Sequence, residues 1–161
     1  MVLTFQPDQI QMMMHQAERT YAEECCGLLL GIQDIATDRR WVQELLPMEN
    51  RWTTEVQTLT EHAPPTSTLD KRTRYWIDPK ALMEAQRYGR DRGWIILGVY
   101  HSHPDHPAVP SERDRRLAWT GYSYPILSVM NGKVATLQSW RLGDDKQFYA
   151  EAITTENQMP A

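Results

Sequence analysis

The sequence has few cysteines, no long hydrophobic run and no surplus of basic residues. Its two cysteines, Cys25 and Cys26, are adjacent, which is a poor arrangement for a structural disulfide and unlike the spaced pairs that bind zinc. Free thiols are typical of a reducing compartment, so we expect a cytoplasmic protein. No apolar stretch approaches the roughly 18 residues of a membrane span, and residues 1–7 lack the features of a secretion signal. We therefore expect neither export nor a membrane span.

The charge balance and the missing motifs exclude further classes. The formal net charge is -4 and the pI is near 5.7, whereas nucleic-acid-binding domains normally carry a basic surplus. The chain has no His-Glu-x-x-His motif, no phosphate-binding loop and no spaced cysteine pair of the zinc deaminases. Residues 121–125 approach the nucleophile elbow of serine hydrolases but lack its final glycine and its strand-turn-helix context. We therefore do not expect a serine hydrolase.

A dense group of metal-binding side chains directly follows an apolar run. Residues 94–100 are rich in β-branched and aromatic residues, which predicts a strand buried on both faces. His101 and His103 continue this strand, and side chains two positions apart point to the same face. The two imidazoles are therefore predicted to converge on one metal ion.

Asp114 completes this group of candidate ligands. Ser111 is a good N-cap for a helix that begins at Glu112, so Asp114 lies in the first turn and can reach back to the strand end. Two imidazoles, one carboxylate and an open position are the ligand set of a catalytic zinc ion. A His-x-His pair is commonly structural on its own, and a Ser-x-x-Asp commonly serves only as a cap. Their joint spacing is the specific signal.

This spacing resembles the His-x-His-x7-Ser-x-x-Asp signature of the JAMM (MPN+) metalloproteases, zinc peptidases that cleave peptide or isopeptide bonds after ubiquitin-like proteins. The family also carries a glutamate three residues before a small residue that opens an apolar strand, and residues 24–31 match that pattern. Glu23 and Glu24 both precede the strand, and alternation places them on opposite faces. The family register selects Glu24. The resemblance extends from about residue 7 to about residue 149 and favours the small bacterial members.

The resemblance implies a JAMM/MPN fold of the cytidine deaminase-like type and a metal-assisted amide hydrolysis. It makes His101, His103 and Asp114 the zinc ligands, Glu24 the general base and acid, and Ser111 an oxyanion donor that also caps its helix. The small bacterial members act on ubiquitin-like sulfur-carrier proteins that end in Gly-Gly, so we expect such a carrier or its conjugate as the substrate. Two alternatives stay open: a non-catalytic MPN-type scaffold, and a zinc hydrolase of small peptides or amides.

Hydrophobic periodicity predicts a single α+β domain over residues 1–161, with a curved, mainly antiparallel sheet flanked by helices. We expect helices over residues 7–22, over 79–93 behind an Asp78 cap, and after Ser111. Strands are expected over 3–5, 26–32, 41–46, 74–77, 94–103, 124–130, 134–141 and 148–153, with a hairpin turn at Asn131-Gly132. Residues 48–73 are expected to form a polar loop insertion, either a mobile surface loop or a flap that shapes the substrate groove. The tail is expected to fray from about residue 154.

Overall fold

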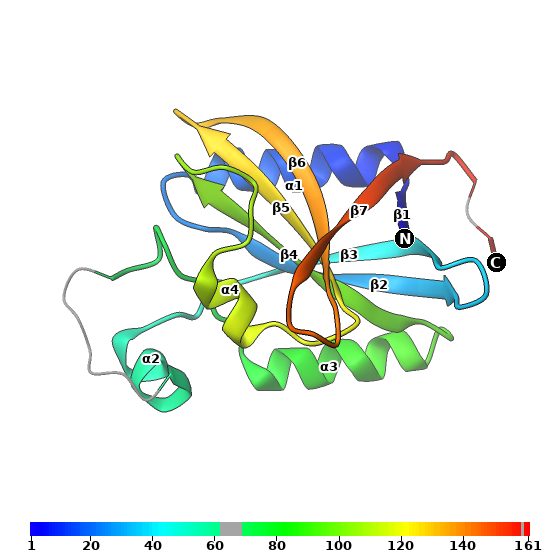
Figure 1. The fold of residues 1–161 in the computed structure, drawn as a ribbon, viewed down its shortest axis with the longest axis horizontal. Coiled ribbons are helices and arrows are strands. Elements are labelled where there is room, and N and C mark those ends of the chain that lie inside the picture. Colours follow the sequence, from blue (N-terminus) through cyan, green and yellow to red (C-terminus); the bar gives the residue numbers. More distant parts are fainter. Residues whose placement is uncertain (62–68, 159) are drawn as a thin grey trace.

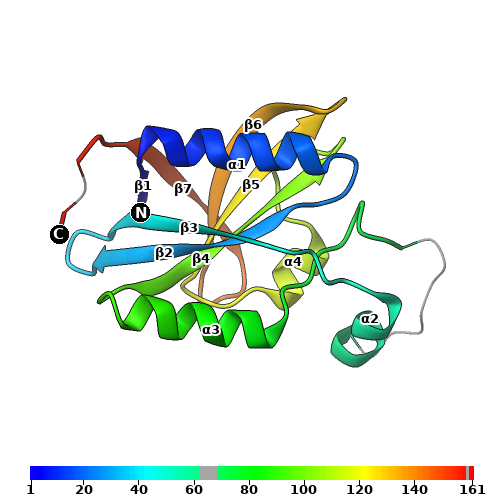
Figure 2. The ribbon, with the colours of Figure 1, turned by 180° about the vertical axis from the view of Figure 1, so that it is seen from behind.

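Helices pack against both faces of a strongly curved sheet in this computed structural model, which describes residues 1–61, 69–158 and 160–161 (Figures 1 and 2). The elements in chain order are β1 (Val2–Phe5), α1 (Pro7–Thr20), β2 (Cys26–Asp34), β3 (Arg39–Met48), α2 (Thr54–Glu61), α3 (Pro79–Arg90), β4 (Ile95–Pro104), α4 (Glu112–Leu117), β5 (Ser123–Met130), β6 (Lys133–Leu142) and β7 (Phe148–Thr155). The mixed α/β class predicted from the sequence is confirmed. None of the helices in the described part of the chain is long and apolar enough to cross a membrane.

The strands form a closed barrel in the order β1-β3-β2-β4-β5-β6-β7. Strand β2 pairs antiparallel with β3 and β4, and β5, β6 and β7 form a second antiparallel group. The parallel pairing of β4 with β5 joins the two groups, and α4 lies in the connection between these strands. The short β1 runs parallel to both β3 and β7 and closes the barrel.

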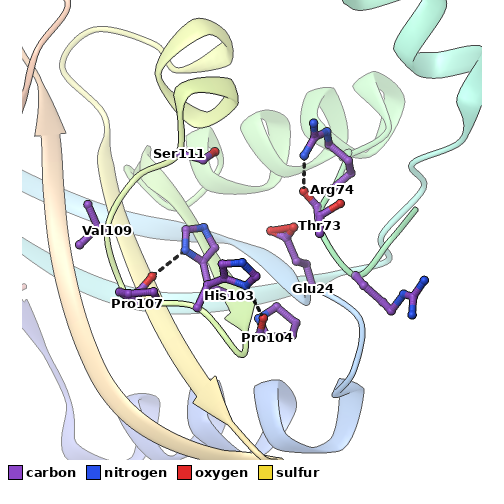
Figure 3. A pocket seen from close by; sticks show the side chains of 10 residues that line it. Glu24, Thr73, Arg74, His103, Pro104, Pro107, Val109 and Ser111 are labelled. Carbon is purple, nitrogen blue, oxygen red and sulfur yellow. Dashed lines mark hydrogen bonds between the residues drawn. The ribbon is translucent and has the colours of Figure 1, made fainter. Parts of the chain in front are cut away.

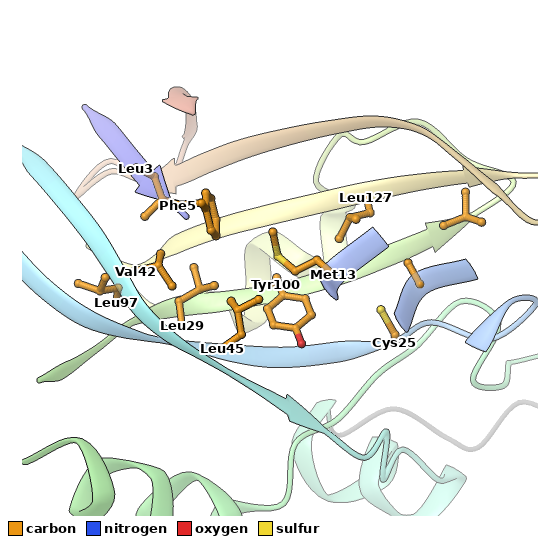
Figure 4. Close-up of a cluster of buried hydrophobic side chains, with 12 residues drawn as sticks. Leu3, Phe5, Met13, Cys25, Leu29, Val42, Leu45, Leu97, Tyr100 and Leu127 are labelled. Carbon is orange, nitrogen blue, oxygen red and sulfur yellow. The ribbon is translucent and has the colours of Figure 1, made fainter. Parts of the chain in front are cut away.

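Two apolar clusters hold β2 and β4 from opposite sides. Leu29 packs in the larger cluster together with Tyr100 and with the buried side chains of α1 (Figure 4). The neighbouring Leu28 and Leu30 point the other way and pack with Ala85 of α3. All three leucines are fully buried, and such burial contributes roughly 1.5–3 kcal/mol per side chain. The two strands are therefore rigid supports for whatever lies at their ends.

The start of α3 and the turn between β5 and β6 lie where the sequence predicts them. The Asp78 side chain accepts a hydrogen bond from the Lys80 backbone N–H (2.9 Å), and Pro79 is the first residue of α3. Asn131 and Gly132 have φ angles of 49° and 81°, which fit the two central positions of a type I′ hairpin turn between β5 and β6.

Two local predictions are wrong. The polar insertion is not loop throughout, because α2 forms there behind Thr53, whose Oγ1 accepts a hydrogen bond from the Val56 N–H (3.2 Å). Residues 74–77 are not a strand; the Asn50 side chain bonds the backbone of Arg74 and Trp76, and the Arg51 N–H donates to the Trp76 carbonyl (2.8 Å). Strand β7 pairs with β1 as far as Thr155, and the frayed tail expected from about residue 154 stays a prediction. The centre of the predicted loop, residues 62–68, lies outside the described residues.

Candidate metal centre and active site

The end of β4 presents two histidines to the same side. The Nε2 atoms of His101 and His103 are 3.0 Å apart, as strand alternation predicts. His101 is fully buried, and the side chain of His103 is 11% exposed. The Nδ1 of His103 lies 2.9 Å from the carbonyl oxygen of Pro107. Because a carbonyl can only accept, Nδ1 carries a proton, which leaves Nε2 as the ring atom that would bind a metal.

The cap of α4 fixes a carboxylate opposite these histidines. The Asp114 backbone N–H donates to Ser111 Oγ (3.0 Å), and the Ser111 N–H donates to Asp114 Oδ2 (2.8 Å). This reciprocal capping box sets the orientation of the Asp114 side chain. Its Oδ1 lies 3.3 Å from His101 Nε2, and its Oδ2 lies 3.2 Å from His103 Nε2. The three predicted metal ligands therefore meet at one point.

Glu24 lies beside this point and is almost fully buried, whereas Glu23 is exposed. The pairing of Cys26 with His101 places the start of β2 next to the end of β4. A carboxylate oxygen of Glu24 and one ring nitrogen each of His101 and His103 all lie within 4.8 Å of one another. Burial raises the pKa of Glu24 to about 8, although the charge of His103 opposes this shift. A carboxyl group that titrates near neutral pH can both take up and return a proton.

The protonation of the other groups follows from their burial and contacts. Burial lowers the pKa of His101, which favours the neutral ring that a metal requires. Burial also opposes protonation of His103, but its hydrogen bond to Asp114 and the charge of that carboxylate outweigh burial and raise its pKa. For Asp114, burial opposes ionisation, yet the two histidines together hold its pKa well below the usual range. The carboxylate is therefore ionised.

These residues fit a metal ion in number, chemistry and spacing. Two ligands on a tetrahedral zinc ion are about 3.3 Å apart, close to the separations of 3.0–3.3 Å among the His101, His103 and Asp114 donor atoms. The ring of His101 is held from the other side by Tyr75, whose ring stacks on it at a centroid distance of 4.6 Å and an interplanar angle of 28°. The donor set and its support are therefore assembled within this chain.

A cavity of about 580 Å³ opens directly onto these groups (Figure 3). Its volume lies in the usual range for small-ligand and substrate sites. The carboxylate of Glu24 and the ring of His103 form part of its wall, and a segment of the insertion forms another part. The lining residues are Glu24, Arg72, Thr73, Arg74, His103, Pro104, His106, Pro107, Val109 and Ser111. A substrate in this cavity would contact the candidate catalytic groups.

Motif analysis of the sequence missed three residues that build this site: Asn50, Arg74 and Tyr75. The Asn50 Nδ2 donates to the carbonyl oxygens of Glu24 (3.1 Å) and Arg74 (2.9 Å). Its Oδ1 accepts from the backbone N–H groups of Trp52 (3.1 Å) and Trp76 (3.2 Å). One amide thus joins the insertion to the candidate base. No local pattern signals these residues, because each acts through a tertiary contact.

Comparison with known families and proteins gives one consistent result. Residues 7–143 match the family model described as prokaryotic homologs of the JAB domain. The chain is 34% identical to the desampylase of Haloferax volcanii over 131 residues, which cover 81% of this chain and 78% of that protein. It is 27% identical to the CysO-cysteine peptidase of Mycobacterium tuberculosis over 144 residues, which cover 89% of this chain and 84% of the peptidase.

A shorter match and two solved structures extend these similarities. The chain is 43% identical to the probable TtuB-protein conjugate cleaving protease of Thermus thermophilus over 54 residues, which cover 34% of this chain and 36% of that protein. A solution structure of a Desulfitobacterium hafniense protein superposes with a TM-score of 0.75 at 30% identity, covering 98% of this chain and 94% of that one. A JAB1/MPN domain protein from Archaeoglobus fulgidus has a TM-score of 0.53 at 14% identity, with 96% of each chain covered, which supports the fold.

Proposed function

The chain belongs to the family of prokaryotic homologs of the JAB domain, and from this premise we propose that it is a zinc metallopeptidase acting after the C-terminal Gly-Gly of a ubiquitin-like sulfur-carrier protein. The membership confirms the family predicted from the sequence. Relatives are named for cleaving conjugates of such carriers, including the TtuB conjugate and CysO-cysteine. The observation that carries the proposal is the meeting of His101, His103 and Asp114 with Glu24 at the wall of one cavity.

Dependence on a metal follows from the family, and zinc is the ion that we propose. His101, His103 and Asp114 would hold it, which leaves one tetrahedral position open on the side of the cavity. When bound, the ion supplies Lewis acidity to the scissile carbonyl and acidifies the attacking water. Imidazole nitrogens and a single carboxylate suit zinc better than magnesium or calcium, which prefer oxygen ligands.

Glu24 is the group that moves the proton. Its raised pKa, about 8, suits a carboxylate that accepts a proton from water and returns it to the leaving amine. In this reaction the C–N bond breaks, the oxygen of the water becomes part of the terminal glycine carboxylate of the carrier, and the amine leaves with the returned proton. The low exposure of Glu24 keeps bulk water from competing for that proton.

Ser111 is suited to two tasks at once. In the cap its Oγ accepts a hydrogen bond from the Asp114 N–H, which uses an oxygen lone pair and leaves the hydroxyl hydrogen available. That hydrogen can donate to the oxyanion that develops on the scissile carbonyl, because Ser111 lines the cavity. Helix capping and oxyanion stabilisation are therefore compatible in one residue.

Two other functions are weaker explanations of the same site. A non-catalytic scaffold has no use for a buried glutamate beside two histidines whose carboxylate accepts no hydrogen bond from the described residues, since such a group costs stability. A hydrolase of small amides would share the chemistry and differ only in substrate, which the assay below separates. We also place the protein in the cytoplasm, a proposal supported by the two buried free thiols of Cys25 and Cys26.

The test is a cleavage assay on a sulfur carrier joined through its Gly-Gly to a reporter. The zinc-loaded wild type should release a carrier that ends in Gly-Gly, as measured by mass spectrometry, and a chelator should stop the reaction. Glu24→Gln should keep its zinc and cleave about 10³-fold more slowly, whereas Glu23→Gln, at the exposed neighbour, should match the wild type. Absence of cleavage by a zinc-loaded wild type, or an undiminished rate in Glu24→Gln, would contradict the proposal.

A further inference from the structure

Arg74 lies in the wall of the cavity with most of its hydrogen-bonding capacity unused (Figure 3). Its Nη1 donates to the backbone carbonyl of Thr73 (2.8 Å), and its Nε is buried with no hydrogen-bond partner among the described residues. No acidic side chain of the described residues forms an ion pair with it, and residues 62–68, which lie outside that part, contain no Asp or Glu. The guanidinium is therefore a half-buried cation that forms no ion pair with a carboxylate of the described residues.

The three buried arginines have more hydrogen-bond partners than Arg74. Arg113 donates to Glu61 (2.8 Å), and Arg141 donates to Glu151 (2.7 Å). Arg40 has no carboxylate but donates to three oxygens, those of Leu97 (3.2 Å), Ser123 (2.8 Å) and Gly121. Burial of a guanidinium costs free energy that such partners offset. Among the described residues Arg74 has no ion pair to offset this cost. Burial together with the nearby Arg113 lowers its pKa, and the charges of Glu61 and Glu24 only partly oppose that shift.

The position of Arg74 relative to the candidate base is fixed. The Asn50 amide bridges the carbonyl oxygens of Glu24 and Arg74, so the two backbones are held side by side. The two side chains are close enough for the charge of Arg74 to lower the pKa of Glu24 against the larger effect of burial. An anion bound by Arg74 would therefore lie near the scissile bond, on a part of the substrate close to the reacting atoms.

The chemistry of the leaving group determines whether such an anion exists. When a single amino acid is joined through its α-amine to the last glycine of a carrier, its free carboxylate is one carbon from the scissile nitrogen. When the amine belongs to a lysine side chain, four methylene groups separate the scissile nitrogen from the lysine Cα, and no anion lies close to the scissile bond. Arginine binds carboxylates through two parallel hydrogen bonds, which makes it suited to this distinction.

We propose that Arg74 binds the free α-carboxylate of an amino acid attached to the carrier, so that the enzyme prefers carrier–amino acid adducts to isopeptide conjugates. This inference rests on the proposed function and narrows its substrate class. Arg74 would bind the leaving amino acid and so determine substrate specificity. The chemistry at Glu24 and the metal ligands would be the same for both substrate types.

The experiment compares two substrates that differ only in charge: a sulfur carrier whose Gly-Gly is extended by one alanine, with either a free carboxylate or a carboxamide end. Wild-type kcat/KM should favour the carboxylate by about 30-fold, the value of one or two charge-assisted hydrogen bonds. Arg74→Gln should bring this ratio close to one through a rise in KM for the carboxylate substrate. Arg51→Gln should retain the ratio, since Arg51 lies outside the cavity and is exposed and paired with Glu49.

The outcomes separate this inference from the proposed function. Cleavage of both substrates at equal efficiency by the wild type would overturn the role of Arg74 and leave the peptidase intact. Cleavage of neither would contradict the proposed function itself. Arg74→Lys, which keeps the charge without the paired donors, should retain part of the preference, and a full wild-type ratio in folded Arg74→Gln would also overturn the inference. The wild-type ratio remains decisive if Arg74→Gln does not fold.

Discussion

Buried charges gather at both ends of β4, and they are satisfied in very different ways. Near its start lies the Glu151 network, which we define as Arg40, Ser123, Ser139, Arg141 and Glu151. The Glu151 Oε1 accepts from Arg141 Nε (2.7 Å) and Ser123 Oγ (3.1 Å), and Oε2 accepts from Ser139 Oγ (2.8 Å). Arg40 donates to the carbonyl of Leu97, which ties the network to β4 (3.2 Å).

At the other end of β4, the candidate site leaves its polar groups under-used. No described residue donates a hydrogen bond to the carboxylate of Glu24, although the residue is 4% exposed, and the Nδ1 of His101 is buried without a partner. Buried polar groups are normally paired, and exceptions concentrate at functional sites. The same chain thus uses one set of buried charges for stability and keeps another available for a metal, a proton and a substrate.

Removal of Glu151 should give the largest change in stability. Glu151→Ala leaves the Ser139 hydroxyl without its acceptor and removes one of the two carboxylates paired with the buried Arg141, so the free energy of unfolding should fall by about 3–5 kcal/mol. Urea unfolding followed by circular dichroism would measure this loss. Glu49→Ala, which removes an exposed pair with Arg51, should change stability by no more than about 0.5 kcal/mol. Equal effects in the two variants would show that the network is not structural.

Removal of the Ser111 hydroxyl should affect function more than stability. Ser111→Ala should lower kcat about 10²-fold through the lost oxyanion donor and cost about 1 kcal/mol of stability through the lost cap. Thr53→Ala removes a comparable cap from α2, away from the cavity, and should cost similar stability at an unchanged rate. If both variants cleave a carrier fusion at the same rate, Ser111 is only a cap.

Neutralising Glu24 should stabilise the metal-free protein, in contrast to the loss at Glu151. The pKa of Glu24 is raised from 4.5 to about 8 in the folded state. Wild-type stability therefore falls as the pH rises from 4.5 to 8, because in this range the Glu24 carboxyl ionises freely only in the unfolded chain. Glu24→Gln removes this penalty and should gain about 4 kcal/mol at pH 8 and almost nothing at pH 4.5. Thermal unfolding of the apoproteins across that pH range tests this. A gain that does not depend on pH, or a loss, would contradict the assignment.

The candidate metal ligands could be predicted from the sequence because their placement depends on local rules. Strand alternation brings His101 and His103 to one face, and the cap at Ser111 orients Asp114, so a short segment encodes the three candidate ligands. The choice between Glu23 and Glu24 required the family register, because alternation alone leaves both open. In the structure, Glu24 faces the cavity.

The parts that could not be predicted depend on contacts between distant segments. Closure of the barrel requires Val2 to lie beside both Arg39 and Ala152, and no local pattern records such pairing. Glu151 carries a charge that is rarely buried in proteins, yet it is buried in the structure. Asn50 lies in a polar insertion without periodicity and Arg74 in a segment predicted as a strand, and only the fold brings the two residues to the site.

The most direct test of the central claim is the zinc content of the purified protein, measured by elemental analysis without added metal. The wild type should contain about one zinc ion per chain, His103→Ala should contain none, and His15→Ala, at an exposed position of α1, should match the wild type. A folded wild type that contains no zinc and takes up none on titration would contradict the account, as would undiminished zinc in His103→Ala.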